Sequence, residues 1–204
     1  THSYDEAEFS RKIEFVRKAA ASRRWRLAWD LGCNTGTFSQ IAAEHADYVV
    51  AMDGDWMAIE HLYQREKAGR GSKSILPLVI NLADASPNQG WRGLERKGLA
   101  ERGSPEFTLC LALIHHVVIS ANIPLADFIG WLAGLGTSLV IEFVGRDDEM
   151  VQTLLANRED QYDDYHPEVF RELLAAHFDI KDEQDLKGGK RRIYFAAAKR
   201  APAY

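Results

Sequence analysis

Short apolar segments alternate with amphipathic segments along most of this 204-residue chain, and this alternation constrains the fold more than any other feature. Parallel strands need a long crossover, usually a helix, so the alternation predicts a mostly parallel sheet with helices on both faces. The apolar spacing predicts helices over residues 5–22, 37–45, 56–67, 125–133 and 168–176. It predicts seven strands, over residues 26–30, 48–52, 75–80, 109–114, 138–144, 178–182 and 192–197.

The last two predicted strands are joined by a turn sequence, Lys187-Gly188-Gly189-Lys190. Such a short, glycine-containing connection favours a hairpin. The predicted fold class is therefore α/β: a doubly wound, mostly parallel seven-stranded sheet with an antiparallel C-terminal edge hairpin. Ligands of such sheets bind at the carboxyl ends of the strands, near the point where the strand order reverses.

The composition is that of a globular domain, with 46% hydrophobic and 27% charged residues. We expect residues 1–204 to form one domain, with an N-terminal helical segment (1–24) and a core (25–198). Within the core, residues 145–167 form an insertion that is a candidate to cover a substrate. The formal net charge of −5 disfavours a nucleic-acid module, and two cysteines suit a reducing, cytoplasmic setting better than a disulfide framework.

Two further features bear on the setting of the protein. The chain begins at Thr1, which predicts a piece of a longer protein, and its charged first residues do not resemble a signal peptide. Residues 107–126 lack Asp, Glu, Lys and Arg over 20 positions, which is long enough to span a membrane. Because this stretch contains polar residues and Pro124, we interpret it as a buried strand followed by a loop, and we expect no membrane partner.

The first predicted strand ends in an acid and runs into a loop that opens a helix, Asp30-Leu31-Gly32-Cys33-Asn34-Thr35-Gly36. Glycine permits a tight turn and a close approach of the backbone to a ligand, and asparagine tolerates a positive φ. The spacing differs from the glycine pattern of nicotinamide-binding loops and from that of a P-loop. A carboxylate at the head of the loop suits a cationic ligand, such as one that carries an ammonium and a sulfonium group.

This loop resembles the first motif of the class I S-adenosylmethionine-dependent methyltransferases, with Asn34 at the usual position of the middle glycine. Asp53 closes the second strand as that family's ribose-binding acid does, and Ile114-His115-His116 is similar to the hydrophobic-His-His sequence of its small-molecule members. The resemblance spans about residues 25–198. Other motifs resemble an uncharacterised branch of the family that includes a nodulation-type methyltransferase: Leu76-Pro77-Leu78, Ser86-Pro87, Gly90-Trp91 and Leu113-Ile114-His115-His116.

The resemblance implies a Rossmann-like fold, S-adenosyl-L-methionine as cofactor, and in-line methyl transfer to a small molecule or peptide. It implies that Asp30 meets the methionyl ammonium group and that Asp53 holds the ribose. The family's third strand usually ends in an acid that accepts a hydrogen bond from the adenine; here Asn81 stands there, with Asp84 three residues on. The residues predicted to bind the cofactor are Asp30, Gly32, Cys33, Asn34, Thr35, Gly36, Asp53, Gly54, Asp55, Trp56, Asn81, Leu82, Ala83 and Ala112.

Other side chains are candidates for contact with the methyl acceptor. His115 and His116 are candidate catalytic residues because histidine removes protons near neutral pH; alternatively, one of them packs in the core. Glu142 either faces the substrate or forms a structural ion pair. Tyr162 and Tyr165 belong to an acidic and aromatic stretch, residues 159–166, that either attracts a cationic substrate or is a solvated loop. We expect no metal site, because adjacent histidines at a strand end diverge.

Two alternative functions stay open at this stage. The first is methylation of RNA, for which Trp91 with Arg92, Arg96 and Lys97 is the candidate contact, although the acidic chain makes a nucleic-acid partner less favourable. The second is a catalytically silent cofactor-binding module of a larger protein. The oligomeric state and the acceptor are not indicated by the sequence.

Overall fold

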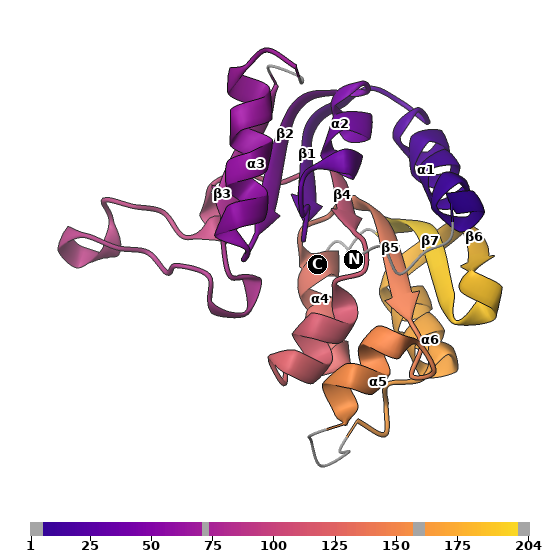
Figure 1. Ribbon diagram of the computed structural model, residues 1–204. Helices are drawn as coiled ribbons and strands as arrows, with labels where there is room; N and C mark the ends of the chain where they lie inside the picture. Colours follow the sequence, from indigo (N-terminus) through magenta and orange to yellow (C-terminus); the bar gives the residue numbers. More distant parts are fainter. Residues whose placement is uncertain (1–5, 71–73, 157–161, 200–204) are drawn as a thin grey trace.

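The computed structural model describes residues 6–70, 74–156 and 162–199, and Figure 1 shows how they are arranged. One sheet has the strand order β3-β2-β1-β4-β5-β7-β6. Its strands are β1 (Trp25–Leu31), β2 (Ala46–Asp53), β3 (Ile75–Val79), β4 (Phe107–Cys110), β5 (Ser138–Val144), β6 (Phe178–Leu186) and β7 (Arg191–Ala198). Strand β7 is antiparallel to both of its neighbours, and the other pairs are parallel. The predicted fold class is confirmed, and β6 forms the outer edge of the hairpin.

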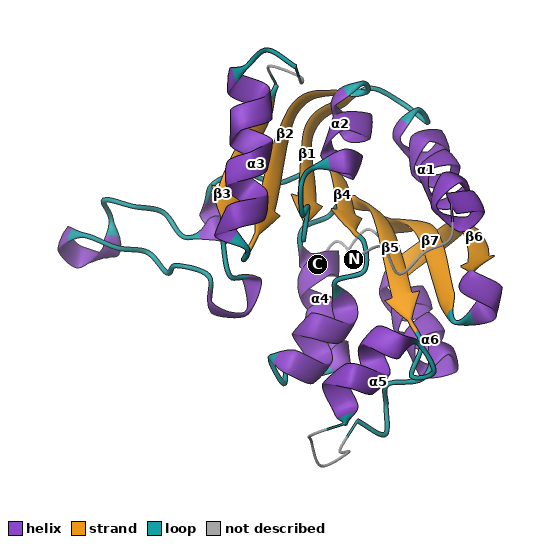
Figure 2. Ribbon diagram, in the orientation of Figure 1, coloured by secondary structure: helices purple, strands orange, loops and turns teal. Residues whose placement is uncertain are grey.

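Helices cover both faces of this sheet (Figure 2). They are α1 (Glu6–Ala20), α2 (Thr37–Ala43), α3 (Trp56–Lys67), α4 (Leu125–Gly134), α5 (Glu149–Leu155) and α6 (Pro167–His177). Helices α1, α2 and α3 bury residues such as Val16 and Leu62 in one core, while α4, α5 and α6 bury residues such as Leu132 and Phe170 in the other. The strands serve both cores because successive side chains point to opposite faces.

Local chemistry explains where several elements begin. Helix α3 starts at Trp56, as predicted, because the Asp55 side chain caps it by accepting hydrogen bonds from the backbone N–H groups of Met57 and Ala58. Helix α6 starts at Pro167, whose fixed φ and missing N–H suit the first helical position.

Apart from small differences in the bounds of elements, the secondary structure departs from the prediction in two places near the ends of β4 and β5. Strand β4 ends at Cys110 rather than at residue 114, because Ala112 adopts a positive φ of 50° and the chain then turns into a π-helix, η4 (His116–Ser120). Helix α5 was not predicted and lies within the expected insertion 145–167. Residues 157–161, which include Glu159 and Asp160 of the acidic stretch, lie outside the described residues.

The uncharged stretch 107–126 forms β4, the turn after it, η4 and the start of α4. None of the helices in the described part of the chain has the length and apolar composition that crossing a membrane requires.

Candidate functional site

A cavity of about 1030 Å³ opens at the carboxyl ends of β1, β2, β3 and β4. This is where the strand order reverses, since β1 lies between β2 and β4. Its wall brings together most of the residues that the sequence singled out: Asp30, Gly32, Cys33, Asn34, Thr35, Asp53, Gly54, Asn81, Leu82, Ala83, Ala112, His115 and His116. Three of the predicted cofactor-binding residues, Gly36, Asp55 and Trp56, are not in this wall.

The loop after β1 has an unusual backbone conformation where it lines the cavity. Gly32, Asn34 and Gly36 all have positive φ, between 49° and 79°. The N–H groups of Gly32 and Cys33 donate to the Met52 carbonyl, at 2.8 and 3.0 Å. Gly36 lies behind the wall: its φ is 79°, and a Cβ atom there would lie 2.6 Å from the Leu62 side chain of α3, so a larger residue would be strained and would displace that side chain.

The Asp53 carboxylate ties this loop to the end of β2. Its Oδ2 atom accepts from the Asn34 N–H at 2.7 Å, and its Oδ1 atom accepts from the Asp55 N–H at 2.9 Å. An ionised carboxylate has about four lone-pair sites. Each oxygen therefore retains a site for another donor, such as one of two neighbouring hydroxyl groups of a ligand.

The Asp30 carboxylate is buried at the bottom of the cavity and accepts a 2.6 Å hydrogen bond from the Ser39 hydroxyl. Burial raises the pKa of Asp30 to about 6, the Ser39 hydrogen bond opposes this, and the nearby Asp53 charge adds to it. Within the described ranges Asp30 forms no ion pair, although the Lys12 charge also opposes the rise of its pKa. A buried acid whose charge is not neutralised by a direct ion pair favours a cationic ligand group.

The end of β3 contributes a polar side chain and two backbone positions. Asn81 caps the short 3₁₀ turn that follows, accepting from the Ala83 N–H at 3.1 Å. Asn81, Leu82 and Ala83 line the cavity, whereas Asp84 is not in its wall.

The rings of His115 and His116 lie against each other rather than diverging, with centroids 4.2 Å apart and planes tilted by 39°. The expectation of divergence was wrong because the pair lies on a helical turn and not at a strand end. His115 is buried, its Nδ1 atom has no hydrogen-bond partner within the described part of the chain, and burial lowers its pKa to about 3. His116 is exposed, and partial burial lowers its pKa less. Among the described residues, no three His, Cys, Asp or Glu side chains are grouped to hold a metal ion.

Glu142 is structural, and we correct the alternative that it faces a substrate. It is fully buried and pairs with Lys12 at 2.6 Å and with Arg191 at 3.5 Å. Arg191 also pairs with Asp148 at 2.8 Å. Lys12 and Arg191 line the cavity, and neither was predicted to lie there. The signal that could have found them is a glutamate within a buried apolar strand, because such a charge requires a buried cation.

Tyr162 and Tyr165 also lie away from the cavity wall, in the core beside α6. Their hydroxyl groups donate to the backbone carbonyls of Ile119, at 3.0 Å, and Val144, at 2.8 Å. Buried tyrosines satisfy their hydroxyl groups in this way, so the predicted contact with a substrate is not supported by their positions. The insertion instead supplies Met150 of α5 to the cavity.

The remaining wall is mostly apolar. Phe9 of α1 and Phe38 of α2 contact each other edge to face, with ring centroids 6.0 Å apart, and both line the cavity. Burial also raises the pKa of the Cys33 thiol far above its usual value. Cys33 is therefore an uncharged part of the wall and not a nucleophile.

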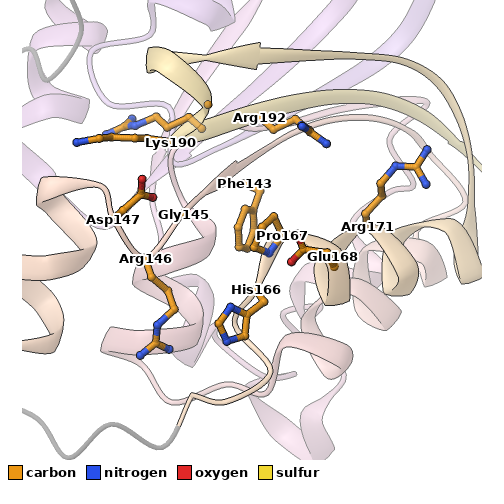
Figure 3. A pocket seen from close by; sticks show the side chains of 12 residues that line it. Phe143, Gly145, Arg146, Asp147, His166, Pro167, Glu168, Arg171, Lys190 and Arg192 are labelled. Carbon is orange, nitrogen blue, oxygen red and sulfur yellow. The ribbon is translucent and has the colours of Figure 1, made fainter.

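A second, smaller cavity of about 360 Å³ lies beyond the ends of β5 and β7 (Figure 3). Its lining is rich in charge, but ion pairs neutralise much of it: Arg171 pairs with Glu183 and Arg192 with Asp185. Arg191 lines both cavities. None of the predicted cofactor-binding residues lines this smaller cavity, so the larger cavity is the candidate site.

Comparisons with known proteins bear on the fold of the chain. No family model matches the chain. The nodulation protein NoeA of Rhizobium meliloti (strain 1021) is 36% identical over 194 residues, which are 95% of this chain; the chain spans about 40% of the length of that relative.

Two solved structures share the fold at low sequence identity. The N-methyltransferase NodS from Bradyrhizobium japonicum WM9, in complex with S-adenosyl-L-homocysteine, has a TM-score of 0.67 at 12% identity, covering 97% of this chain and 90% of NodS. The magnesium protoporphyrin IX methyltransferase ChlM from Synechocystis PCC 6803, with bound S-adenosylmethionine, has a TM-score of 0.61 at 14% identity, covering 95% of this chain and 81% of ChlM. The chain is thus a homologue of one part of NoeA, and it has the fold of the class I S-adenosylmethionine-dependent methyltransferases.

Proposed function

We propose that this chain is a methyltransferase that binds S-adenosyl-L-methionine and transfers its methyl group to a small molecule or peptide. The observation that carries the proposal is the convergence of Asp30, Asp53 and Asn81 on one cavity, from the ends of three neighbouring strands. NodS and ChlM were crystallised with S-adenosylhomocysteine and S-adenosylmethionine respectively, which supports the cofactor assignment.

The side chains present fit such a cofactor. The free lone pairs of Asp53 would accept the two ribose hydroxyl groups, and Asp30 would receive the methionyl ammonium group, directly or through water. Asn81 can accept a hydrogen bond from the adenine amino group through its carbonyl oxygen, which already accepts from the Ala83 N–H. The positive φ values of Gly32 and Asn34 leave the loop backbone free to approach the methionine portion.

The cavity is large enough for a second ligand beside the cofactor. Its volume of about 1030 Å³ is at the upper end of the roughly 300–1,000 Å³ typical of sites for one drug-sized ligand. Phe9, Phe38 and Met150 form an apolar part of the wall, and the paired cation Lys12 lies over the Phe38 ring, 4.9 Å from its centroid. We propose this partly apolar side as the acceptor subsite.

When bound, the cofactor supplies a methyl group already activated by a sulfonium. The chain then needs mainly to position the acceptor in line with that methyl group and to exclude water. His116 is the better candidate to remove a proton from an acceptor N–H or O–H, because it is accessible from the cavity. With a pKa of about 3, His115 stays neutral at pH 7. Its imidazole would accept a hydrogen bond from the substrate and so orient the atom that receives the methyl group.

We further propose that residues 1–204 act as one methyltransferase domain, with part of the segment 145–167 beside the acceptor through Met150. The cytoplasmic setting expected from the cysteines remains part of this proposal. The activity of the longer NoeA-like protein as a whole is likewise a proposal.

Calorimetry with S-adenosylmethionine and S-adenosylhomocysteine tests the cofactor assignment. We expect binding by both ligands and a loss of about 100-fold in Asp53→Ala, which removes two hydrogen bonds to a charged acceptor. No binding of either ligand at millimolar concentration would refute the proposal. Binding without turnover of any acceptor would favour a silent cofactor-binding module, and labelled methyl transfer to RNA would favour the alternative substrate class.

A further inference from the structure

The connection between β3 and β4 carries an arm, residues 86–103, that projects from the sheet beside β3 (Figure 1). Trp91 and Leu94 at its tip are 78% and 75% exposed, the highest values among the exposed large hydrophobic side chains of the described chain. Scattered apolar side chains on a surface are ordinary, but two large ones at the tip of a projection indicate a contact surface.

The arm is ordered by its own hydrogen bonds. Gln89 and Arg96 exchange backbone hydrogen bonds of 2.9 and 3.0 Å, and the turn between them is closed by the Leu94 N–H, which donates to the Trp91 carbonyl at 3.2 Å. Within this turn Arg92 has a φ of 58°, a strained conformation for a residue other than glycine. Strain that keeps apolar side chains pointing outward is typical of a functional segment.

The arm also carries a charge opposite to that of the chain. It has four basic residues and two acidic ones, whereas the whole chain has a net charge of −5. Among the described residues, Arg92, Arg96 and Lys97 form no ion pair. One of the two acids, Glu101, is held by the Asn88 side-chain amide at 2.9 Å. The tip is therefore apolar and the surface behind it is basic.

We propose that this arm binds the surface of an anionic lipid bilayer. Trp91 and Leu94 insert among the headgroups, and Arg92, Arg96 and Lys97 contact the lipid phosphates. Tryptophan favours the membrane–water interface, and each basic side chain near an anionic surface adds to the attraction. The proposal differs from the expectation of no membrane partner, because peripheral binding requires no membrane-spanning helix.

The shape and composition of the tip favour a bilayer over two other partners. A projection can insert into a fluid surface, whereas a protein partner would need a groove that matches it. Binding to single-stranded nucleic acid relies on several stacked aromatic side chains, and the tip has only Trp91. The proposal does not depend on methyl transfer, and its test uses no cofactor.

The test is sedimentation with sucrose-loaded vesicles of phosphatidylcholine alone or with 30% phosphatidylglycerol, in 50 mM salt. We expect the partition coefficient to be about tenfold higher with phosphatidylglycerol and to fall as salt is added. Trp91→Ala and Leu94→Ala should each lower it at least about threefold. Tyr63→Ala is the matched control, because Tyr63 is 45% exposed on α3 and has Lys67 over its ring, yet it lies outside the arm.

Brominated lipids provide a second measurement that is insensitive to partial unfolding. Quenching of tryptophan fluorescence that Trp91→Phe abolishes would support insertion of the tip. The proposal is overturned if the wild-type chain does not sediment with anionic vesicles, or if both tip variants bind like Tyr63→Ala. It is also overturned if the chain does not bind vesicles but binds another partner through the tip. That result would be a gel shift with a single-stranded oligonucleotide, or a crosslink to a purified protein, that Trp91→Ala abolishes.

Discussion

We expect the affinity for S-adenosylhomocysteine to fall about tenfold between pH 7 and pH 5, because Asp30 loses its charge over this range. Burial raises the pKa of Asp30 to about 6. A group with this pKa is about 90% ionised at pH 7 and about 10% ionised at pH 5. The ligand's ammonium group favours the ionised carboxylate, so the association constant should follow the ionised fraction.

Isothermal titration calorimetry between pH 5 and pH 7.5 measures this dependence, with circular dichroism to verify the fold at each pH. Asp30→Asn should remove the dependence and bind weakly throughout. Ser39→Ala should move its midpoint to higher pH, because the Ser39 hydrogen bond lowers the pKa of Asp30. His116→Gln is the control for titration of the neighbouring imidazole and should keep the dependence. An affinity that does not change with pH, or a dependence that survives in Asp30→Asn, would refute the contact between Asp30 and the ammonium group.

Three further expectations concern stability. Lys12→Met should lower the free energy of unfolding in urea by about 3–5 kcal/mol, because it leaves the buried Glu142 without its nearest cation; the double variant with Glu142→Gln should recover part of this loss. Gly36→Ala should cost at least about 1 kcal/mol and weaken cofactor binding, since its φ is 79° and its Cβ would lie 2.6 Å from a leucine side chain of α3; an unchanged melting temperature would contradict this. Burial raises the pKa of Asp148, but hydrogen bonds led by that from Arg191 outweigh it and hold this pKa well below its usual value. A depressed pKa gives stability that is present above about pH 4 and lost as the pH falls, so Asp148→Asn should be less stable at pH 7 and lose less stability in acid unfolding.

The regular part of the fold follows from local patterns. Period and length identify the strands, and the cap at Asp55 fixes the start of α3. The sequence pattern could not locate the end of β4, because residues 109–114 are continuously apolar and an apolar run does not distinguish a strand from a turn. Helix α5 was missed because it is only seven residues long and buries a single side chain, Val151.

The part of the cavity wall proposed to bind the cofactor was predictable as a cluster, because its residues belong to loops that follow strands directly. The acceptor end was not, because it is built from Phe9 and Lys12 near one end of the chain, Met150 from α5, and Arg191 near the other end. Contacts between such distant positions leave no periodic pattern. The position of Tyr162 was not predictable for a related reason. An amphipathic ring beside acids is equally suited to contact with a ligand and to burial in a core, and here the Tyr162 hydroxyl group donates to a backbone carbonyl.

The ion pair between Lys12 and Glu142 has a consequence for how the protein is made. These residues are 130 positions apart, and the neighbouring contact from the Gly188 N–H to Glu8 spans 180 positions. Helix α1 leaves the ribosome well before its partners on β5 and next to β7, which are synthesised more than a hundred residues later. The wall that α1 contributes therefore closes only after β5 and the residues before β7 have been synthesised, so a nascent chain should acquire its capacity to bind ligand, and the resistance of α1 to proteases, together in one step.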